Sequence, residues 1–193
     1  MKSVLLNNVF LMIAMVSTTA MATAAHADFL RVCERTPAVK VFLERAVAKT
    51  CDKIAESDLT AIKRVAVPGQ NIQAFRDGDF SGLPNLEILN IKGNPFKTLN
   101  RGLLAELPKL KTLVIFRTGL TEVPDDFLEN NPLIENLHMF GSVFTTLPET
   151  VWARFNAFQH FVQVDFDQAL ETASGGRLSR IFREGGSVSL ILH

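Results

Sequence analysis

The sequence predicts an α/β solenoid: a chain wound into coils of similar size that stack with short parallel strands on a concave side. Two observations support this prediction. One is an apolar pattern that repeats every 24 residues, and the other is a helical segment ahead of it that fits the cap such an array needs. The pattern is clearest in "LEILNIKGNPFKTL", residues 86–99, where the apolar positions are spaced too unevenly for a helix or a regular strand.

Six columns of apolar residues recur over four copies of this pattern, and all of their positions are apolar. A fixed period of 20–50 residues indicates a repeat architecture, in which each coil buries its apolar side against its neighbours. The columns are Ile62, Leu86, Leu110 and Ile134; Val65, Leu89, Leu113 and Leu137; Val67, Ile91, Ile115 and Met139; Ile72, Phe96, Leu120 and Phe144; Phe75, Leu99, Val123 and Leu147; and Phe80, Leu104, Leu128 and Trp152.

The spacing within one copy predicts a short strand followed by a turn. Leu89 and Ile91 are two residues apart, so they point to the same face of a strand. Asn94 follows where the chain turns, and its side chain can bond backbone groups that the turn leaves unpaired. Thr118 and Ser142 replace this asparagine in the next two copies, so we expect looser turns there.

These segments resemble the leucine-rich repeat family. "LEILNIKGNPFKTL" is similar to its consensus, while "LKTLVIFRTGLTEV" and "IENLHMFGSVFTTL" are weaker matches. The resemblance covers residues 62–155. It implies a leucine-rich repeat right-handed superhelix with short parallel concave strands and a helical N-terminal cap. It implies almost nothing about which partner the protein binds.

The N-terminal residues have the features of an export leader. Lys2 supplies a positive start, an apolar run follows over residues 9–16, and Ala25-His26-Ala27 fits a signal-peptidase site. We expect a signal peptide over 1–27 and a periplasmic or secreted protein. The alternative is a buried N-terminal helix. The apolar run is too short to span a membrane, so no integral span is expected.

The segment 28–61 is expected to form the N-terminal cap. Thr36 and Pro37 fit the start of a helix over residues 37–48, whose apolar side chains fall on one face. Cys33 and Cys51 flank this helix, and an even pair in an exported chain indicates a disulfide, with two separate buried thiols as the alternative. Bacterial secreted leucine-rich repeat proteins often carry a helical, disulfide-tied cap, which this segment resembles.

Four repeats are expected over 62–157, followed by a degenerate repeat and C-terminal cap over 158–193. The 24-residue spacing aligns Phe161 with Leu137 but turns Gln163 inward. A shift of one residue turns Val162 and Val164 inward instead. Both registers break the pattern.

Composition and motifs argue against several functions. The chain has 20 basic and 20 acidic side chains and no concentrated basic patch, so no nucleic-acid partner is expected. No catalytic or cofactor-binding motif is present, and we expect a protein that is not an enzyme and has no cofactor. His138 and His160 are expected to be solvated rather than to bind metal, because no third ligand is evident.

The strand positions between the buried residues are expected to face solvent on the concave side. Several are apolar, which on a soluble protein usually marks a contact surface, and Phe116 is expected to contact Phe140. We therefore expect binding of a protein or peptide; the alternatives are that the C-terminal segment covers this patch, or that it has no role. The second functional hypothesis is a structural or self-associating cell-envelope protein that assembles through the patch or through "SVSLIL". The predicted partner-binding residues are Ile88, Asn90, Lys92, Thr112, Val114, Phe116, Asn136, His138 and Phe140, and the first coil adds Arg64, Ala66 and Pro68.

Overall fold

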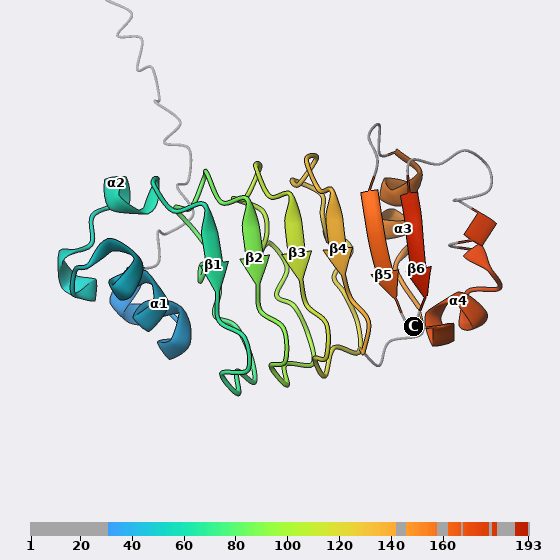
Figure 1. Ribbon diagram of the computed structural model, residues 1–193, viewed down its shortest axis with the longest axis horizontal. Helices are drawn as coiled ribbons and strands as arrows, with labels where there is room; N and C mark the ends of the chain where they lie inside the picture. The colour runs from blue at the N-terminus through green and yellow to red at the C-terminus, as the bar shows by residue number, and fades with distance from the viewer. Residues whose placement is uncertain are drawn as a thin grey trace, which may run out of the picture.

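The chain winds into stacked coils whose strands form one parallel sheet in chain order (Figure 1). The structure is a computed structural model that describes residues 31–141, 146–157, 162–166, 168–177, 179–180 and 188–192. The predicted solenoid fold is confirmed. The strands are β1 (Arg64–Ala66), β2 (Ile88–Asn90), β3 (Thr112–Val114), β4 (Asn136–His138), β5 (Val162–Phe166) and β6 (Val188–Leu192).

The 24-residue period sets the register of the first four strands. Leu89 of β2 pairs with Val65 on one side and Leu113 on the other, and Leu113 pairs with Leu137. The period then changes, because Leu137 pairs with Val164, 27 residues later.

Both predicted registers for the fifth strand were therefore wrong. The 24-residue spacing gave Leu137 the partner Phe161, and the one-residue shift gave it Val162. The arc before β5 contains the nine-residue helix α3 (Glu149–Ala157) where the earlier coils have turns, and the coil is three residues longer. Phe158 and Phe161 themselves lie outside the described residues.

The six apolar columns form one continuous core. Every column position in the described residues is buried, and Leu89, Leu113 and Leu137 have no exposed surface. Phe144 lies outside the described residues. Each coil presents its apolar side to the next, so the core depends on neighbouring coils rather than on any coil by itself.

The turn after β2 is fixed by the side chain of Asn94, which is completely buried. Its Oδ1 accepts hydrogen bonds from the backbone N–H groups of Gln70 (2.8 Å) and Ile72 (3.2 Å) in the preceding coil. Its Nδ2 donates to the carbonyls of Val67 (2.9 Å) and Ile91 (2.8 Å). The side chain therefore ties two coils together.

The turn after β3 is held more weakly, as the Thr118 substitution predicted. Thr118 Oγ1 donates to the Ile115 carbonyl at 3.2 Å and accepts from the Leu120 N–H at 3.4 Å. Both partners lie in its own coil, and both bonds are long. Ser142, the next residue in this column, lies outside the described residues.

The N-terminal cap consists of short helices packed against β1. They are η1 (Val32–Glu34), α1 (Pro37–Val47), η2 (Cys51–Lys53) and α2 (Glu56–Leu59). Thr36 is the N-cap of α1, as predicted, while Ala48 adopts a left-handed φ of 53° and ends the helix one residue early. Val39 and Leu43 are buried, but Ala46, expected on the same face, is exposed.

The start of the second cap helix is fixed by the side chain of Asp58. Helix α2 begins at Glu56, and the Asp58 Oδ2 accepts a hydrogen bond from the Ala55 N–H at 2.8 Å. Asp58 therefore caps the helix from its third position instead of preceding it.

A disulfide joins Cys33 to Cys51, and their Cα atoms are 5.0 Å apart. This confirms the predicted pairing, which requires the flank of α1 to fold back along the helix. Disulfides are typical of oxidising compartments outside the cytoplasm. Residues 1–27, which are predicted to form a signal peptide, lie outside the described residues. No helix among the described residues is long and apolar enough to cross a membrane.

A buried polar network, which the sequence patterns did not predict, joins the cap to the first coil. The Thr36 N–H and Oγ1 donate to the Asp79 carboxylate at 2.7 and 2.6 Å. Arg35, 1% exposed, donates to the backbone carbonyls of Asp79 (3.0 Å) and Ser81 (2.8 Å). Burial lowers the pKa of the Arg35 guanidinium to about 10, although the Asp79 carboxylate opposes the shift.

Candidate functional site: the concave strand face

Three rows of side chains cross the concave face from coil to coil. In each strand the middle residue is buried and its neighbours are not, so alternation turns the neighbours outward. Arg64 is exposed, Pro68 is exposed, and the remaining members are half-buried. The first row is Arg64, Ile88, Thr112 and Asn136; the second is Ala66, Asn90, Val114 and His138; the third is Pro68, Lys92, Phe116 and Phe140.

The third row lies just beyond the strand ends, yet backbone hydrogen bonds still hold its register. The N–H groups of Gly69, Gly93 and Arg117 donate to the carbonyls of Lys92, Phe116 and Phe140 at 2.9, 3.0 and 2.9 Å. Equivalent side chains in the third row are therefore fixed beside one another. This places two phenylalanines next to a lysine.

The phenylalanines of the third row form an aromatic stack. The Phe116 and Phe140 ring centroids are 4.6 Å apart, and the ring planes differ by 11°, which confirms the predicted contact. Lys92 Nζ lies 4.9 Å from the Phe116 centroid, and the Arg117 guanidinium carbon lies 5.9 Å from it. Two cations thus lie within cation–π distance of one half-buried ring.

Arg117 has an unfavourable backbone conformation. Its φ is 52°, in the left-handed region, where the other described coils have Gly69, Gly93 and Gly141 at 61°, 67° and 72°. A side chain in this region costs about 1 kcal/mol or more. Arg117 was missed as a site residue, although the three glycines in its column were a signal for it.

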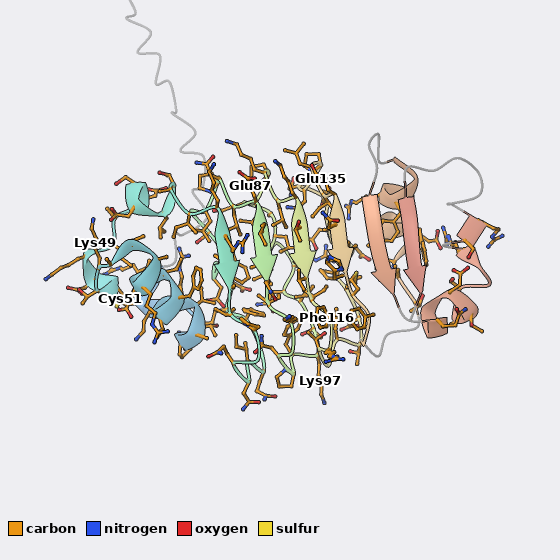
Figure 2. All side chains as sticks on the ribbon, in the orientation of Figure 1. Lys49, Cys51, Glu87, Lys97, Phe116 and Glu135 are labelled. Carbon is orange, nitrogen blue, oxygen red and sulfur yellow. A yellow bond between two sulfur atoms is a disulfide. The ribbon has the colours of Figure 1, made fainter. Side chains whose placement is uncertain are left out.

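The charges at the opposite ends of the strands are neutralised within the protein. Glu87 pairs with Lys63 at 3.7 Å and with Lys111 at 3.4 Å. Figure 2 shows Glu87 and Glu135 at the edge where the strands begin, and Phe116 toward the edge where they end. Within the described residues neither Lys92 nor Arg117 forms an ion pair, so the two edges of the face differ in charge.

A hollow of about 410 Å³ extends the concave face toward the cap. It lies between helix α1 and the first coil, and Ala66 of the second row forms part of its wall. Val41, which is 37% exposed, and Arg45 lie on the α1 side. The site predicted from the sequence did not include this hollow. The lining residues are Pro37, Ala38, Val41, Phe42, Arg45, Ala66, Val67 and Gln70.

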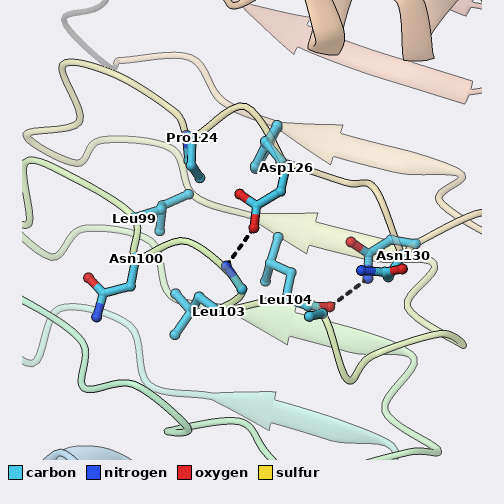
Figure 3. Close-up of a pocket in the computed structure, with 11 residues that line it drawn as sticks. Leu99, Asn100, Leu103, Leu104, Pro124, Asp126 and Asn130 are labelled. Carbon is cyan, nitrogen blue, oxygen red and sulfur yellow. Dashed lines mark hydrogen bonds between the residues drawn. The ribbon is translucent and has the colours of Figure 1, made fainter. Parts of the chain in front are cut away.

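A separate cavity of about 10 Å³ lies among the arcs of the second and third coils, away from this face (Figure 3). The Asp126 Oδ2 accepts a bond from the Gly102 N–H at 2.7 Å, and the Asn131 Nδ2 donates to the Leu104 carbonyl at 3.0 Å. Oδ1 of Asp126 and of Asn131 is buried without a protein partner. The space suits about one water molecule, which could satisfy an oxygen of this kind.

A wider groove of about 660 Å³ runs across the coils where prolines precede the strands. Pro84, Pro108 and Pro132 recur along it, and Glu106 uses its Oε2 to accept the Gly82 N–H at 3.0 Å. No group of three or more histidine, cysteine or acidic side chains positioned to hold a metal occurs among the described residues. His138 is half-buried in the second row, and His160 lies outside the described residues.

The comparisons with known proteins agree with the geometry. The leucine rich repeat family matches residues 60–120. Over 94 residues, 48% of this chain, the sequence is 29% identical to leucine-rich repeat-containing G-protein coupled receptor 5 from Xenopus tropicalis. The chain spans about a tenth of the length of that relative. Leucine-rich repeats are usually non-catalytic and typically bind proteins. The match over residues 60–120 and the stacked parallel strands agree with the fold of a leucine-rich repeat solenoid.

Proposed function

We propose that this protein is a non-catalytic binding module that recognises a protein or peptide through its concave strand face. The observation that carries the proposal is the stack of Phe116 on Phe140, half-buried on a face where Ile88 and Val114 are also apolar. These positions are half-buried, so polar side chains there would cost the fold less than at the fully buried positions of the strands. An apolar surface retained there fits a contact surface.

The polar members of the rows suit a peptide backbone. Asn90 and Asn136 carry amides that can both donate and accept, and the Thr112 hydroxyl can do the same. They surround the apolar positions instead of forming a cluster of acids, bases and nucleophiles. This composition supports recognition rather than chemistry.

The proposal includes where the protein works. We place cleavage of the leader after Ala27 and the working protein in the periplasm or outside the cell. The Cys33–Cys51 disulfide supports an oxidising compartment.

The concave proposal is tested with the double variant Phe116→Glu and Phe140→Glu. We expect it to fold, because both rings are half-buried, and to lose the partner that the wild type captures from envelope or culture fluid. Circular dichroism and thermal melting check the fold. Leu133→Glu, at a 44% exposed leucine outside the rows, is the matched control and should keep the partner. If the double variant unfolds while Leu133→Glu does not, the two rings belong to the core and the proposal fails.

The second candidate function is structural self-association. Strand β6 is the last strand of the described sheet, with β5 on one side, and the edge of a sheet can pair with another chain. Sizing by light scattering at low and high protein concentration separates the two candidates. A dimer or larger species at high concentration favours self-association, and a monomer at both concentrations favours recognition.

A further inference from the structure

The concave rows carry positive charge without negative charge. Arg64 begins the first row, Lys92 lies in the third, and Arg117 follows Phe116 directly, while none of the twelve row positions is aspartate or glutamate. Arg45 adds a cation in the neighbouring hollow. The whole chain has equal numbers of basic and acidic side chains, so this face is locally biased.

Among the residues that the structure describes, neither cation beside the aromatic stack forms an ion pair. Lys63 and Lys111, at the other edge, share Glu87. Lys92 and Arg117 instead lie 4.9 and 5.9 Å from the centroid of Phe116. Because each retains N–H donors beside a half-buried apolar surface, peptide carboxylates can bind to these cations while a neighbouring apolar side chain covers the rings.

The backbone at Arg117 gives an independent reason to assign a role to this side chain. Glycine relieves the left-handed conformation in the equivalent coils, and Arg117 keeps it at φ 52°. Gly141, the next glycine in this column, packs tightly against Arg117, since a Cβ there would lie 3.1 Å from Arg117 Cγ and 3.2 Å from its N. An arginine is thus held in a strained conformation, packed against the neighbouring turn, with its cation beside the stack.

We infer that the third row, with Arg117, binds a linear peptide segment that carries carboxylates next to aromatic or aliphatic side chains. This inference rests on the concave face being the binding surface. Lys92 and Arg117 would bind the carboxylates, and the Phe116–Phe140 stack would receive the apolar side chain. The amides of the first and second rows would bond the peptide backbone.

A single-stranded nucleic acid also uses cations and stacked rings, but the face suits it less well. Such a strand follows a continuous positive groove, since its affinity depends on neutralising successive phosphates. Here the first row ends in Asn136, and the third row ends in two phenylalanines, so the charge is confined to part of the face.

The test is a selection from a display library of random linear peptides on the immobilised wild type. Peptides that also bind Phe116→Ala with Phe140→Ala are removed. We expect the remaining peptides to be enriched in glutamate or aspartate beside apolar residues. Their affinity should fall steeply when NaCl rises from about 0.1 M to about 1 M, because the charges are screened.

Arg117→Gly provides the decisive variant, because it removes the cation while restoring the residue of the other coils. It should fold with an unchanged or higher unfolding midpoint and bind the selected peptides roughly tenfold more weakly, the equivalent of one charge-assisted hydrogen bond. Lys53→Gln, which removes one positive charge in the cap, is the matched control. It should change the affinity by less than about twofold.

The outcomes separate the two proposals. Enrichment of neutral or basic peptides that still need the phenylalanines overturns the acidic partner but leaves concave recognition standing. Absence of any phenylalanine-dependent peptide overturns concave recognition itself. If oligo-dT binds in an Arg117-dependent way and no peptide does, the occupant is a nucleic acid and the inference is wrong.

Discussion

Two successive turns of this solenoid are held by hydrogen bonds from a buried polar side chain, but the bonds differ in number and length. In the second coil, buried Asn94 makes four bonds of 2.8–3.2 Å and a fifth of 3.4 Å to the Lys92 carbonyl, and three of its partners lie in the preceding coil. In the third coil, Thr118 makes two bonds of 3.2 and 3.4 Å, both within its own coil. The residue before each side chain differs too, since Gly93 relieves the left-handed conformation and Arg117 does not.

The difference shows where this molecule departs from its own repeat. At the turn that follows Phe116, the third coil has Arg117 and Thr118 where the second coil has glycine and asparagine. Phe116 and Arg117 of the proposed binding site lie at that weaker turn. Local backbone strain at a binding surface persists only when the surrounding structure holds it in place. The second coil, which Asn94 bonds to the first, provides such a support.

Replacing the turn residue should have the largest effect in the second coil. Asn94→Ala removes a buried side chain and leaves two N–H groups and one carbonyl of the preceding coil, and one carbonyl of its own coil, without their partner. We therefore expect a loss of about 3–5 kcal/mol in the free energy of unfolding. Thr118→Ala should cost only about 0.5–1 kcal/mol. Urea unfolding of both variants measures the difference, and equal losses would show that the two turns are held alike.

The cap is a second strongly held region, because the Cys33–Cys51 disulfide crosses it. Cys33→Ser with Cys51→Ser opens a loop with a sequence separation of 18 residues, and we expect a loss of about 3 kcal/mol. Hydrogen exchange should show the loss in α1 rather than in the third coil. Reduction of the wild type with dithiothreitol is the control and should reproduce the effect; exchange that rises first around Thr118 would contradict it.

The weaker turn should be repairable. Thr118→Asn puts the side chain of the second coil into the third, where it can reach the neighbouring backbone, so we expect a gain of about 1 kcal/mol. Gln70→Asn, at the same column position in the first coil, serves as the control, because Gln70 is exposed and no repeat precedes it. A gain at Gln70 equal to that at Thr118 would show that the bonds between coils are not the cause.

The smallest effect is expected at the surface of the cap. Hydrogen bonds from Lys49 Nζ and from the Ala55 N–H lower the pKa of the Asp58 carboxyl below its ordinary 3.8. The folded-state pKa lies below the unfolded one, so this contribution to stability is present above pH 3.8 and disappears as the pH falls through the lowered pKa.

Asp58→Asn should therefore have a slightly lower unfolding midpoint than the wild type at neutral pH, and the two midpoints should converge in acid. Thermal melts at a series of pH values measure this convergence. Asp52→Asn, at another aspartate of the cap, is the control. A difference between Asp58→Asn and the wild type that persists at the lowest pH would mean that charge is not the cause.

Patterns that repeat along the chain could be predicted from the sequence because a solenoid is built from contacts between equivalent positions. Leu89, Leu113 and Leu137 align because each coil has the same length. The same logic predicted the contact of Phe116 with Phe140, and the cysteine count predicted the bond from Cys33 to Cys51.

Only the tertiary structure decided the features that break the repeat. The coil that contains helix α3 is longer than the others, so Leu137 pairs with Val164. A fixed 24-residue period could not predict this partner. The network of Arg35 and Asp79 joins residues 44 positions apart through a backbone carbonyl, and the strain at Arg117 lies in a dihedral angle. Periodicity determines which side chains face the core, because burial repeats with the coil. Polar pairing and backbone strain depend on where single atoms meet, so they became known only from the folded chain.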